Sequence, residues 1–496
     1  MSRRPFLAGA ALLLGSFLLL LPGLGLRPLA SRAEARIPLV ALDIVRTGRV
    51  FPPYMLGEPY LNKPPLHHLL CAGAVAVFDS HDETVVRLPS ALCGAVAIWL
   101  TWLMAARLAG QRAGWIAAAF LFLTYKFFSL ARSTELEILL TAAVALAYLG
   151  LSNALWKPAS HPGAPAPRPA SGLTRADVPA RQAAPTSEGW GRGAPAAHSA
   201  LSGWLLGAVG VAIACLAKGP VIAVLFPIVL LAADAIIARS WRRLVSFGPL
   251  ILLLGAAVGT GAYYGPLIVN LGGVRELMNR LAFENVQHAR GFHYYSWQLP
   301  LGLLPAGLAL PWMLRELRKP DPIPRTCALG VAIGVLVFSL SPSKQSHYML
   351  PLYPLVAVWA GTSGVFARWR IGLIGSLVLA FSVATFAVDK FVAAEARGTT
   401  RRAIGFLGRS AREGPLAIRE RHPLVAYYLD RPDLEVVSEL HATVEFIEKR
   451  RGFVFVDLER GEKLDPSLER FSPRVLEADG HTYVLLLPPE KPDSRR

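Results

Sequence analysis

Charged residues are scarce in this chain, and their scarcity argues against a water-soluble fold. Asp, Glu, Lys and Arg make up only 17% of its 496 residues, whereas soluble domains carry about 25%. Hydrophobic residues account for 53% and form long runs that short Arg-rich connectors interrupt. A soluble chain of this length would divide into several domains with separate cores. The composition therefore predicts an integral membrane protein.

Cysteine is also rare, and its placement argues against a cysteine-based metal site. The four cysteines lie within apolar runs, and none has the CxxC spacing of a zinc site. We expect them to be small buried hydrophobic residues. The net charge of +17 comes from connectors between apolar runs rather than from one basic surface. Nucleic acid is therefore not an expected partner.

Apolar runs of about twenty residues, the length that crosses a bilayer, recur about eleven times. The first is either a signal peptide cleaved near Ala33 or an uncleaved helix. We favour the helix, because the acidic segment after it is the best functional candidate. The run Leu66–Phe78 is too short to span and predicts a juxtamembrane helix. The expected spans are residues 6–30, 88–108, 113–130, 136–155, 203–217, 220–238, 246–270, 297–315, 325–341, 349–367 and 370–389.

Basic connectors predict the orientation of these spans. With Arg3 and Arg4 on the inner side, five later inner connectors are basic, as the positive-inside rule requires. A span at residues 66–78 would place them all outside. The connector at residues 157–200 is rich in Pro, Ala, Gly and Ser and predicts a disordered cytoplasmic linker. The five connectors are residues 107–112, 157–200, 239–243, 315–325 and 368–370.

The composition becomes ordinary and charged after about residue 389. Alternating runs at residues 452–457 and 481–487 predict strands. We therefore divide the chain into a transmembrane domain, residues 1–389, with an outer loop at residues 31–87, and a small α/β domain on the outer side, residues 390–496. This second domain has no catalytic signature, and its expected role is structural or acceptor-positioning.

Ionisable residues from six parts of the chain fall on the predicted outer side. One explanation is that these residues simply lie at the membrane–water interface, since charges at the ends of spans face water or a cavity. A reaction site is the other, because the group pairs carboxylates with fixed cations. A carboxylate suits a base, and Lys, Arg and Tyr suit a phosphate. Cations beside a lipid phosphodiester would stabilise the charge that its leaving phosphate gains.

A series of short motifs occurs in order along the chain. They are AEAR at residues 33–36, TGRVFP at 47–52, GEPYLNKPPL at 57–66, RLPSAL at 87–92, Ala131-Arg132 with Glu137, AKGP at 217–220, FENV at 283–286 and KQSHYMLP at 344–351. Together they resemble the motifs of one family of membrane glycosyltransferases, which includes the lipid A aminoarabinose transferases and, more distantly, the protein O-mannosyltransferases. The resemblance covers about residues 1–390 and implies the helical GT-C fold, with juxtamembrane helices in the first outer loop. It also implies a polyprenyl-phosphate-linked sugar as donor and transfer at the periplasmic face of a bacterial inner membrane.

The resemblance also implies roles for individual residues. Glu34 stands at an Asp-Glu motif near the reaction centre, and Glu137 matches an acidic residue that faces the cavity. Lys63 and Tyr348 match residues that bind the donor phosphate, and Arg290 is a further candidate. Supporting roles fall to Arg36, Arg132, Lys344 and Tyr60.

Two departures from the family pattern change what is expected. Ala33 replaces the first acid of the Asp-Glu pair, so either Glu34 is the base or Glu137 has taken that role. Asn62 replaces a Glu that takes part in a metal site in aminoarabinose transferases. We therefore assign no metal ligands, no certain cofactor and only a possible divalent metal.

The resulting hypothesis is an inverting transfer of a sugar from a polyprenyl phosphate to a lipid, glycan or protein of the envelope. Membrane lipids are the surrounding partner, and the sugar and acceptor stay open. One rival is a transporter or flippase for a lipid-linked sugar, although the sequence shows no internal repeat. Another is a non-catalytic assembly subunit, which the changes at Ala33 and Asn62 keep open.

Overall fold

The computed structural model describes residues 3–29, 31–156, 197–275, 290–366, 368–407, 414–420, 422–458, 462–478 and 481–488. Residues 157–196 of the predicted linker and the motif at residues 283–286 lie outside the described residues. Two compact units are present, and each is described by itself. The first contains residues 1–19, 92–131 and 136–381, and the second contains residues 20–91, 132–135 and 382–496.

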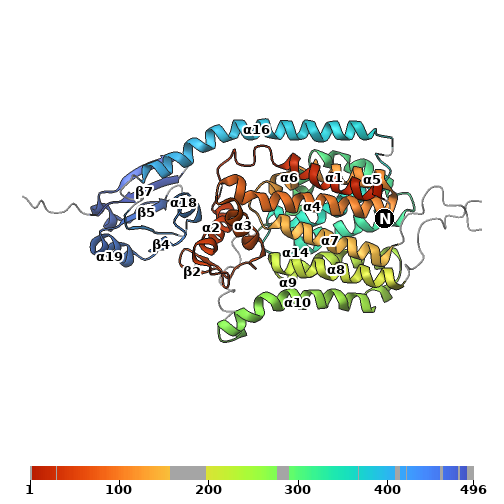
Figure 1. The fold of residues 1–496 in the computed structure, drawn as a ribbon, viewed down its shortest axis with the longest axis horizontal. Coiled ribbons are helices and arrows are strands. Elements are labelled where there is room, and N and C mark those ends of the chain that lie inside the picture. Colours follow the sequence, from red (N-terminus) through yellow and green to blue (C-terminus); the bar gives the residue numbers. More distant parts are fainter. Residues whose placement is uncertain are drawn as a thin grey trace, which may run out of the picture. The chain divides into compact units, whose positions relative to one another are not determined.

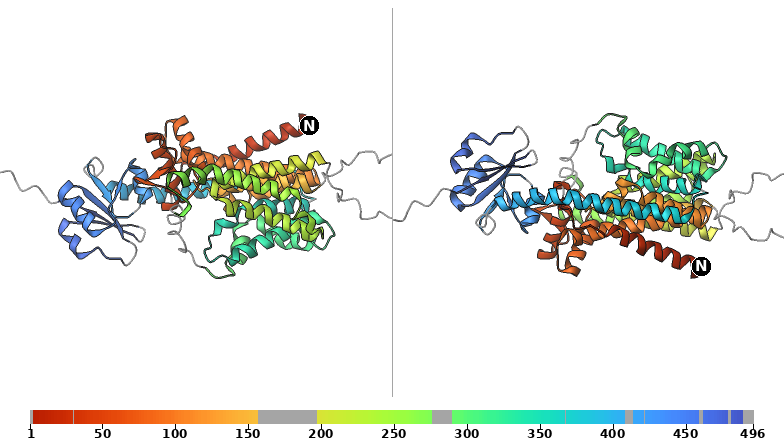
Figure 2. Two further views of the ribbon diagram at one scale, coloured as in Figure 1. Left: turned by 90° about the horizontal axis from the view of Figure 1, so that it is seen from below. Right: turned by 90° about the horizontal axis from the view of Figure 1, so that it is seen from above.

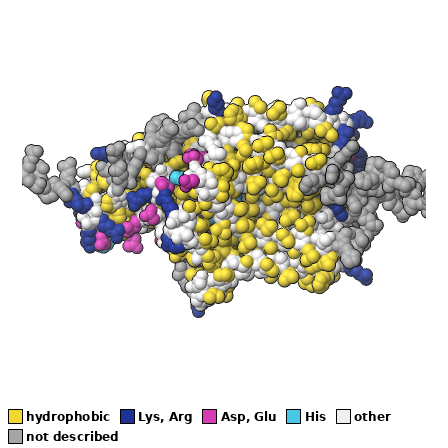
Figure 3. Space-filling view, viewed as in Figure 1, with side chains coloured by type: hydrophobic (Ala, Val, Ile, Leu, Met, Phe, Trp, Pro, Cys, Tyr) yellow, Lys and Arg dark blue, Asp and Glu magenta, His cyan; other side chains and the backbone are white. Residues whose placement is uncertain are grey.

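The first unit consists of helices, most of which run side by side (Figures 1 and 2). Hydrophobic side chains form a broad band over these helices on the face in Figure 3. In chain order its elements are α1 (Arg3–Leu20), α4 (Glu83–Ala109), α5 (Gln111–Phe122), α6 (Tyr125–Ala131), α7 (Glu137–Leu155), α8 (Ala197–Lys218), α9 (Pro220–Ile237), η3 (Trp241–Arg243), α10 (Phe247–Asn270), α12 (Tyr294–Gly302), η4 (Ala306–Ala309), α13 (Leu310–Glu316), α14 (Pro322–Leu340), η5 (Ser346–Leu352), α15 (Tyr353–Thr362) and α16 (Ile371–Phe406); α4 begins and α16 ends in the second unit.

Seven helices in the described part of the chain are long and apolar enough to cross a membrane. They are α4, α7, α8, α9, α10, α14 and α16, and each covers one of the predicted runs to within one residue. The other four runs, residues 6–30, 113–130, 297–315 and 349–367, form helices that are shorter or broken. The chain is thus a multi-pass helical protein, and the count of about eleven spans stays a prediction.

Proline and glycine explain most of the interrupted runs. Residues 297–315 contain Pro300 and Pro305 and fold as three short helical pieces, because proline lacks the N–H that continues a helix. The gap between α5 and α6 pairs with this break, since the Tyr125 N–H donates to the Leu304 carbonyl at 2.7 Å. Two non-helical segments thereby satisfy each other's backbone groups, as an apolar environment requires.

Polar contacts gather at both ends of α7. At its C-terminal end, Arg107 donates to the Ser152 and Trp156 carbonyls, and the Trp156 indole donates to Asp234 at 2.8 Å. Asp234 also pairs with Arg243. Two of the predicted basic connectors therefore lie at the same end of the helix. Glu137 begins α7 at the opposite end, roughly 28 Å away at 1.5 Å per residue.

The second unit contains the predicted first outer loop. Helix α2 (Arg32–Thr47) leads to a hairpin of β1 (Tyr54–Met55) and β2 (Glu58–Pro59), and then to α3 (Leu66–Phe78), the helix predicted to be juxtamembrane. The two residues of the hairpin turn, Leu56 and Gly57, both have positive φ, 55° and 76°. A two-residue turn of this kind matches the twist of the strands. The hairpin holds Tyr60 and Lys63 just before α3.

The C-terminal part of the second unit is a five-stranded sheet in the order β4-β3-β5-β7-β6. The strands predicted at residues 452–457 and 481–487 form β5 and β7, which pair antiparallel. The contacts group this sheet with residues 20–91, so the predicted boundary at residues 389/390 stays a prediction. The elements are β3 (Leu416–Ile418), α18 (Pro423–Tyr428), β4 (Glu435–Val436), α19 (Leu440–Arg450), β5 (Phe453–Leu458), η6 (Pro466–Phe471), β6 (Arg474–Ala478) and β7 (His481–Leu486).

Glycines allow α7 and α8 to approach each other closely. A Cβ added at Gly150 would lie 2.3 Å from the backbone nitrogen of Gly207 and 2.7 Å from the Gly203 carbonyl oxygen. Helices in a bilayer gain no hydrophobic drive from association, so close backbone packing holds them together. The polar contacts at the N-terminal end of α7 depend on this packing, because α8 ends there too.

We expect Gly150→Ala to lower the apparent Tm of the detergent-solubilised protein, at a cost of about 1–3 kcal/mol. The added methyl would meet backbone atoms, which cannot rotate away. Gly261→Ala in α10 is the matched control, because a Cβ there meets nothing within 4 Å. Equal Tm values for the two variants would contradict the packing argument.

Candidate functional site

Glu34 lies in the first turn of α2 and is buried, with 8% of its surface exposed. Ser31 caps the helix by accepting the Glu34 N–H at 3.1 Å. The Arg87 guanidinium, from α4, donates to Oε1 of Glu34 through Nε at 3.0 Å and Nη2 at 2.8 Å. Arg36, to which the resemblance gave a supporting role, is exposed and makes no ion pair within the described residues. The cation that serves Glu34 is therefore Arg87.

Arg87 does more than pair with Glu34. Its remaining N–H groups donate to the carbonyls of Leu24, Arg27 and Pro28, in the irregular segment that precedes α2. Removing one partner from a buried ion pair costs about 3–5 kcal/mol, because the other charge stays buried. Arg87 thus sets both the charge balance of Glu34 and the path of the chain that carries it. It belongs to the RLPSAL motif, but sequence reasoning gave it no role.

Arg132 is 4% exposed and supports the same segment. It pairs with Asp389 at 2.6 Å and donates to the Pro22 carbonyl. Two residues further on, the Thr134 hydroxyl donates to the backbone carbonyl of Glu34. Arg132 thus anchors the segment before α2 at Pro22, and the neighbouring Thr134 anchors the backbone of Glu34.

Tyr60 and Lys63 lie in the turn between β2 and α3. Tyr60 is buried and its ring packs edge-on against His68, with 5.5 Å between ring centres. Lys63 is half-buried, and two prolines follow it before α3 begins. His67 and His68 are both buried, and the hydroxyl of Ser90 contacts His67 Nε2 at 3.2 Å. These histidines are packed inside the unit rather than spread at an interface.

In the first unit, Glu137 is the centre of a second cluster. It is 4% exposed, and its Oε1 lies 2.6 Å from Lys218 Nζ and 3.3 Å from His347 Nε2. Its Oε2 is buried and has no hydrogen-bond partner among the described residues. A buried oxygen of this kind is normally satisfied by a protein group, water or ligand. The geometry therefore suits a ligand donor such as a hydroxyl.

Tyr348 joins this cluster through Lys218, whose ammonium lies 4.3 Å from the centre of the Tyr348 ring. A cation over an aromatic face is held electrostatically. Lys218 therefore connects Glu137 with Tyr348, two residues predicted to be functional. Sequence reasoning assigned no functional role to Lys218 or His347, although both lie in matched motifs, AKGP at residues 217–220 and KQSHYMLP at residues 344–351.

Lys344 and Arg290 meet just before η5. Lys344 Nζ donates to the carbonyls of Arg290, at 3.0 Å, and Ser341. The Arg290 guanidinium lies 5.0 Å from the centre of the Tyr294 ring, and its side chain is exposed. Lys344 therefore orders this turn, whereas Arg290 presents its charge outward.

The structure thus brings the predicted residues into two groups. In the second unit, Arg132 contacts the segment before α2, and Glu34 lies in the first turn of α2. The second group, from neighbouring parts of the first unit, consists of Glu137, Tyr348, Lys344 and Arg290. Their assigned roles stay predictions. Among the described residues, no group of three or more His, Cys, Asp or Glu side chains is placed to hold a metal ion.

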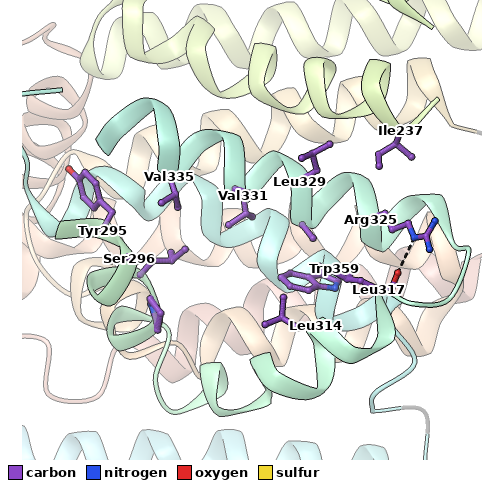
Figure 4. Close-up of a pocket in the computed structure, with 14 residues that line it drawn as sticks. Ile237, Tyr295, Ser296, Leu314, Leu317, Arg325, Leu329, Val331, Val335 and Trp359 are labelled. Atoms are coloured by element: carbon purple, nitrogen blue, oxygen red, sulfur yellow. Dashed lines mark hydrogen bonds between the residues drawn. The ribbon is translucent and has the colours of Figure 1, made fainter. Parts of the chain in front are cut away.

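An apolar groove of about 640 Å³ lies in the first unit, lined by residues of α9, α12, α13, α14 and α15 (Figure 4). Arg325 lies in it and donates to the Leu317 carbonyl at 3.0 Å. Tyr295 also lines it, and its hydroxyl donates to the Gln345 carbonyl at 3.1 Å. Since Gln345 follows Lys344, this groove adjoins the turn in which Lys344 donates to the Arg290 carbonyl.

Comparison with known proteins supports the resemblance predicted from the motifs. Residues 62–161 match the family model "Dolichyl-phosphate-mannose-protein mannosyltransferase". An undecaprenyl phosphate-alpha-4-amino-4-deoxy-L-arabinose arabinosyl transferase of Aeromonas salmonicida is 24% identical over 382 residues, 71% of this chain. The chain spans 61% of the length of that relative.

Solved structures show the fold. The chain is similar to ArnT from Cupriavidus metallidurans in the apo state, with a TM-score of 0.71, 15% identity, and coverage of 96% of this chain and 97% of that one. The same protein bound to undecaprenyl phosphate gives a TM-score of 0.69 at 15% identity, covering 98% and 99% of the two chains. The helical GT-C fold predicted from the motifs is thereby confirmed.

The buried histidine beside Tyr60 gives the second unit a pH dependence. Burial, together with the neighbouring His67, lowers the pKa of His68 from 6.5 to about 3. The unfolded chain therefore binds a proton between these values that the folded chain does not, and stability falls as the pH drops below about 6.5. The loss between pH 7 and pH 5 is about 2 kcal/mol.

We expect His68→Gln to reduce the difference in apparent Tm between pH 7 and pH 5, because glutamine does not titrate. His441→Gln is the control, since His441 is 89% exposed on α19. A pH difference that is the same in His68→Gln as in the unsubstituted protein would argue against a neutral buried His68.

Proposed function

We propose that this protein is a membrane glycosyltransferase that moves a sugar from a polyprenyl-phosphate donor to an envelope lipid, glycan or protein. The proposed place is the periplasmic face of a bacterial inner membrane. The observation that carries the proposal is the cluster of Glu137, Lys218, His347 and Tyr348. It lies at the end of the spanning helix α7 opposite the basic connectors. The family match and the ArnT fold support the same chemistry.

The reaction requires one base and a site for a phosphate whose charge increases. The acceptor hydroxyl attacks the anomeric carbon and forms the new glycosidic bond, with inversion. The bond from that carbon to the phosphate oxygen breaks, and the polyprenyl phosphate leaves with a second negative charge. The base takes the hydroxyl proton. Cations near the leaving oxygen lower the barrier, because they stabilise charge that develops in the transition state.

Glu34 is the proposed base, and Glu137 is the second candidate. Arg87 donates two hydrogen bonds to Oε1 of Glu34 and holds that carboxylate in place. Glu137 has the same arrangement, with Lys218 and His347 on Oε1. In either case the cation fixes the carboxylate in one rotamer. At Glu137 the second oxygen has no hydrogen-bond partner among the described residues and would take the hydroxyl proton.

Lys63, Tyr348 and Arg290 are the proposed ligands of the donor phosphate. Arg290 is exposed, and Lys63 is only half-buried. Lys218 adds a positive charge beside Tyr348. The apolar groove that adjoins the Arg290 turn would take part of the polyprenyl chain, since its lining is hydrophobic apart from a few polar groups. Undecaprenyl phosphate is the lipid bound in one solved ArnT structure.

Lys63→Ala should weaken binding of a labelled polyprenyl-phosphate sugar about 10- to 100-fold, the value of one charge-assisted hydrogen bond. Binding to purified protein in detergent measures this directly. Lys319→Ala, at an exposed lysine of a predicted inner connector, is the control. Unchanged donor binding in Lys63→Ala would remove Lys63 from the phosphate site.

Glu34→Gln should lower kcat about 100-fold or more with little change in donor binding, because glutamine cannot accept the proton. Membranes supplied with labelled lipid-linked sugars measure the transfer, and Glu448→Gln on the exposed face of α19 is the control. An unchanged kcat in Glu34→Gln together with a loss in Glu137→Gln would assign the base to Glu137. Translocation of the donor without any product would favour a flippase instead.

A further inference from the structure

The segment that leads to Glu34 has no regular secondary structure, so side chains hold it. Residues 22–29 form turns rather than a helix or strand. Arg87 and Arg132 satisfy four of their carbonyls. Backbone groups buried without a partner are costly, and charged donors compensate them well. The position of Glu34 therefore depends on groups from distant parts of the chain.

Tyr428 supplies one such group from the C-terminal sheet region. Its hydroxyl accepts the N–H of Leu29 at 2.7 Å and donates to Glu83 Oε1 at 2.8 Å. Both hydroxyl functions are thus used, one on the segment before α2 and the other on the first turn of α4. Burial, followed by the nearby Glu83 carboxylate, raises the pKa of Tyr428, which keeps the hydroxyl protonated as a donor.

Asp457 supplies the second group, from β5. It is 3% exposed and accepts a hydrogen bond from Arg32, the first residue of α2, at 2.6 Å. His422 Nε2 lies 3.0 Å from the same carboxylate, and His422 Nδ1 accepts the Val425 N–H at 3.3 Å. The second bond makes Nε2 the protonated nitrogen, so His422 donates to Asp457. Asp457 is therefore held from its own sheet and in turn holds α2.

We propose that the C-terminal sheet positions Glu34 for the reaction, with Asp457 and Tyr428 as positioning residues that act through Arg32 and Leu29. The proposal rests on the proposed function, since it takes Glu34 as the base. The two residues that the sheet contacts, Arg32 and Leu29, precede Glu34 by two and five residues. Arg87 fixes the carboxylate, and the sheet fixes the backbone from which the carboxylate projects.

A positioning role follows from how strongly transfer rates depend on geometry. A misplacement of about 1 Å in a reacting group can cost about 100-fold in rate. The first turn of α2 carries Glu34, and its N-terminal residue is tied to a side chain that is 425 residues away in sequence. A loss of that tie would let the turn fray without removing any group from the reaction.

The variants Arg32→Gln and Tyr428→Phe test the two contacts separately. Arg32→Gln leaves the His422–Asp457 pair intact, so the sheet keeps its own hydrogen bonds. Tyr428→Phe keeps the ring and removes only the hydroxyl. Glu445→Gln is the matched control, because it breaks an exposed pair with Lys449, at 2.8 Å, on the same sheet domain. Arg32→Lys tests rescue by a conserved charge.

Two measurements on the full-length protein separate positioning from folding. Amide hydrogen exchange of the peptide that covers residues 29–36 should become about tenfold faster in Arg32→Gln and Tyr428→Phe, while α19 exchanges as before. In the transfer assay, kcat should fall about tenfold with donor KM unchanged. Arg32→Lys should recover most of the rate, and Glu445→Gln should match the unsubstituted protein in both measurements.

Exchange at residues 29–36 that matches the control would overturn the proposal, and so would faster exchange with an unchanged kcat. If the protein transfers no sugar from any lipid-linked donor, that result contradicts the proposed function itself. In that case the exchange data still decide whether the sheet holds α2, so the two failures are distinct.

Discussion

Burial of carboxylates beside fixed cations is the constraint on which the candidate site depends. Glu34 and Glu137 are each almost completely enclosed, and each has a cation on one of its two oxygens. An isolated buried carboxylate would be too costly to retain, whereas a paired one is tolerated and held in one orientation. Arg87 and Lys218 are therefore required for the two carboxylates to occupy their positions. At Glu137 the second oxygen, Oε2, has no hydrogen-bond partner among the described residues and is therefore available to a ligand.

A second constraint, satisfaction of the backbone, links the membrane helices to the segment before α2. Where proline breaks the apolar runs, the exposed backbone groups pair across the bundle, as Tyr125 and Leu304 do. Where the chain leaves α1, arginine side chains satisfy the carbonyls instead. The same physical requirement thus produces short helices in one unit and a loop fixed by Arg87 and Arg132 in the other. A loop held in this way fixes the path of the backbone that leads into α2 and Glu34.

Much of the helical architecture could be predicted, because apolar length and the distribution of Arg are properties of local sequence. Seven of the predicted runs form helices of spanning length, and the short run Leu66–Phe78 forms the separate helix α3. The breaks within the other runs were not predicted, because mean hydropathy averages over proline and glycine. Pro300 and Pro305 nevertheless mark one of these breaks in the sequence. The motifs proposed residues for the site, but they could not show which side chains pair. Arg36 follows Glu34 in the same motif, yet the cation that pairs with Glu34 in the structure is Arg87.

The sequence by itself determined that the chain is a multi-pass helical protein whose apolar runs are joined by short basic connectors. Length, hydropathy and charge are additive along the chain, so they are readable without coordinates. Only the tertiary structure decided which cation meets which carboxylate. Arg87 lies 53 residues from Glu34, Lys218 lies 81 residues from Glu137, and Asp457 lies 425 residues from Arg32. Such pairings depend on how helices and strands pack, and no local pattern encodes that packing.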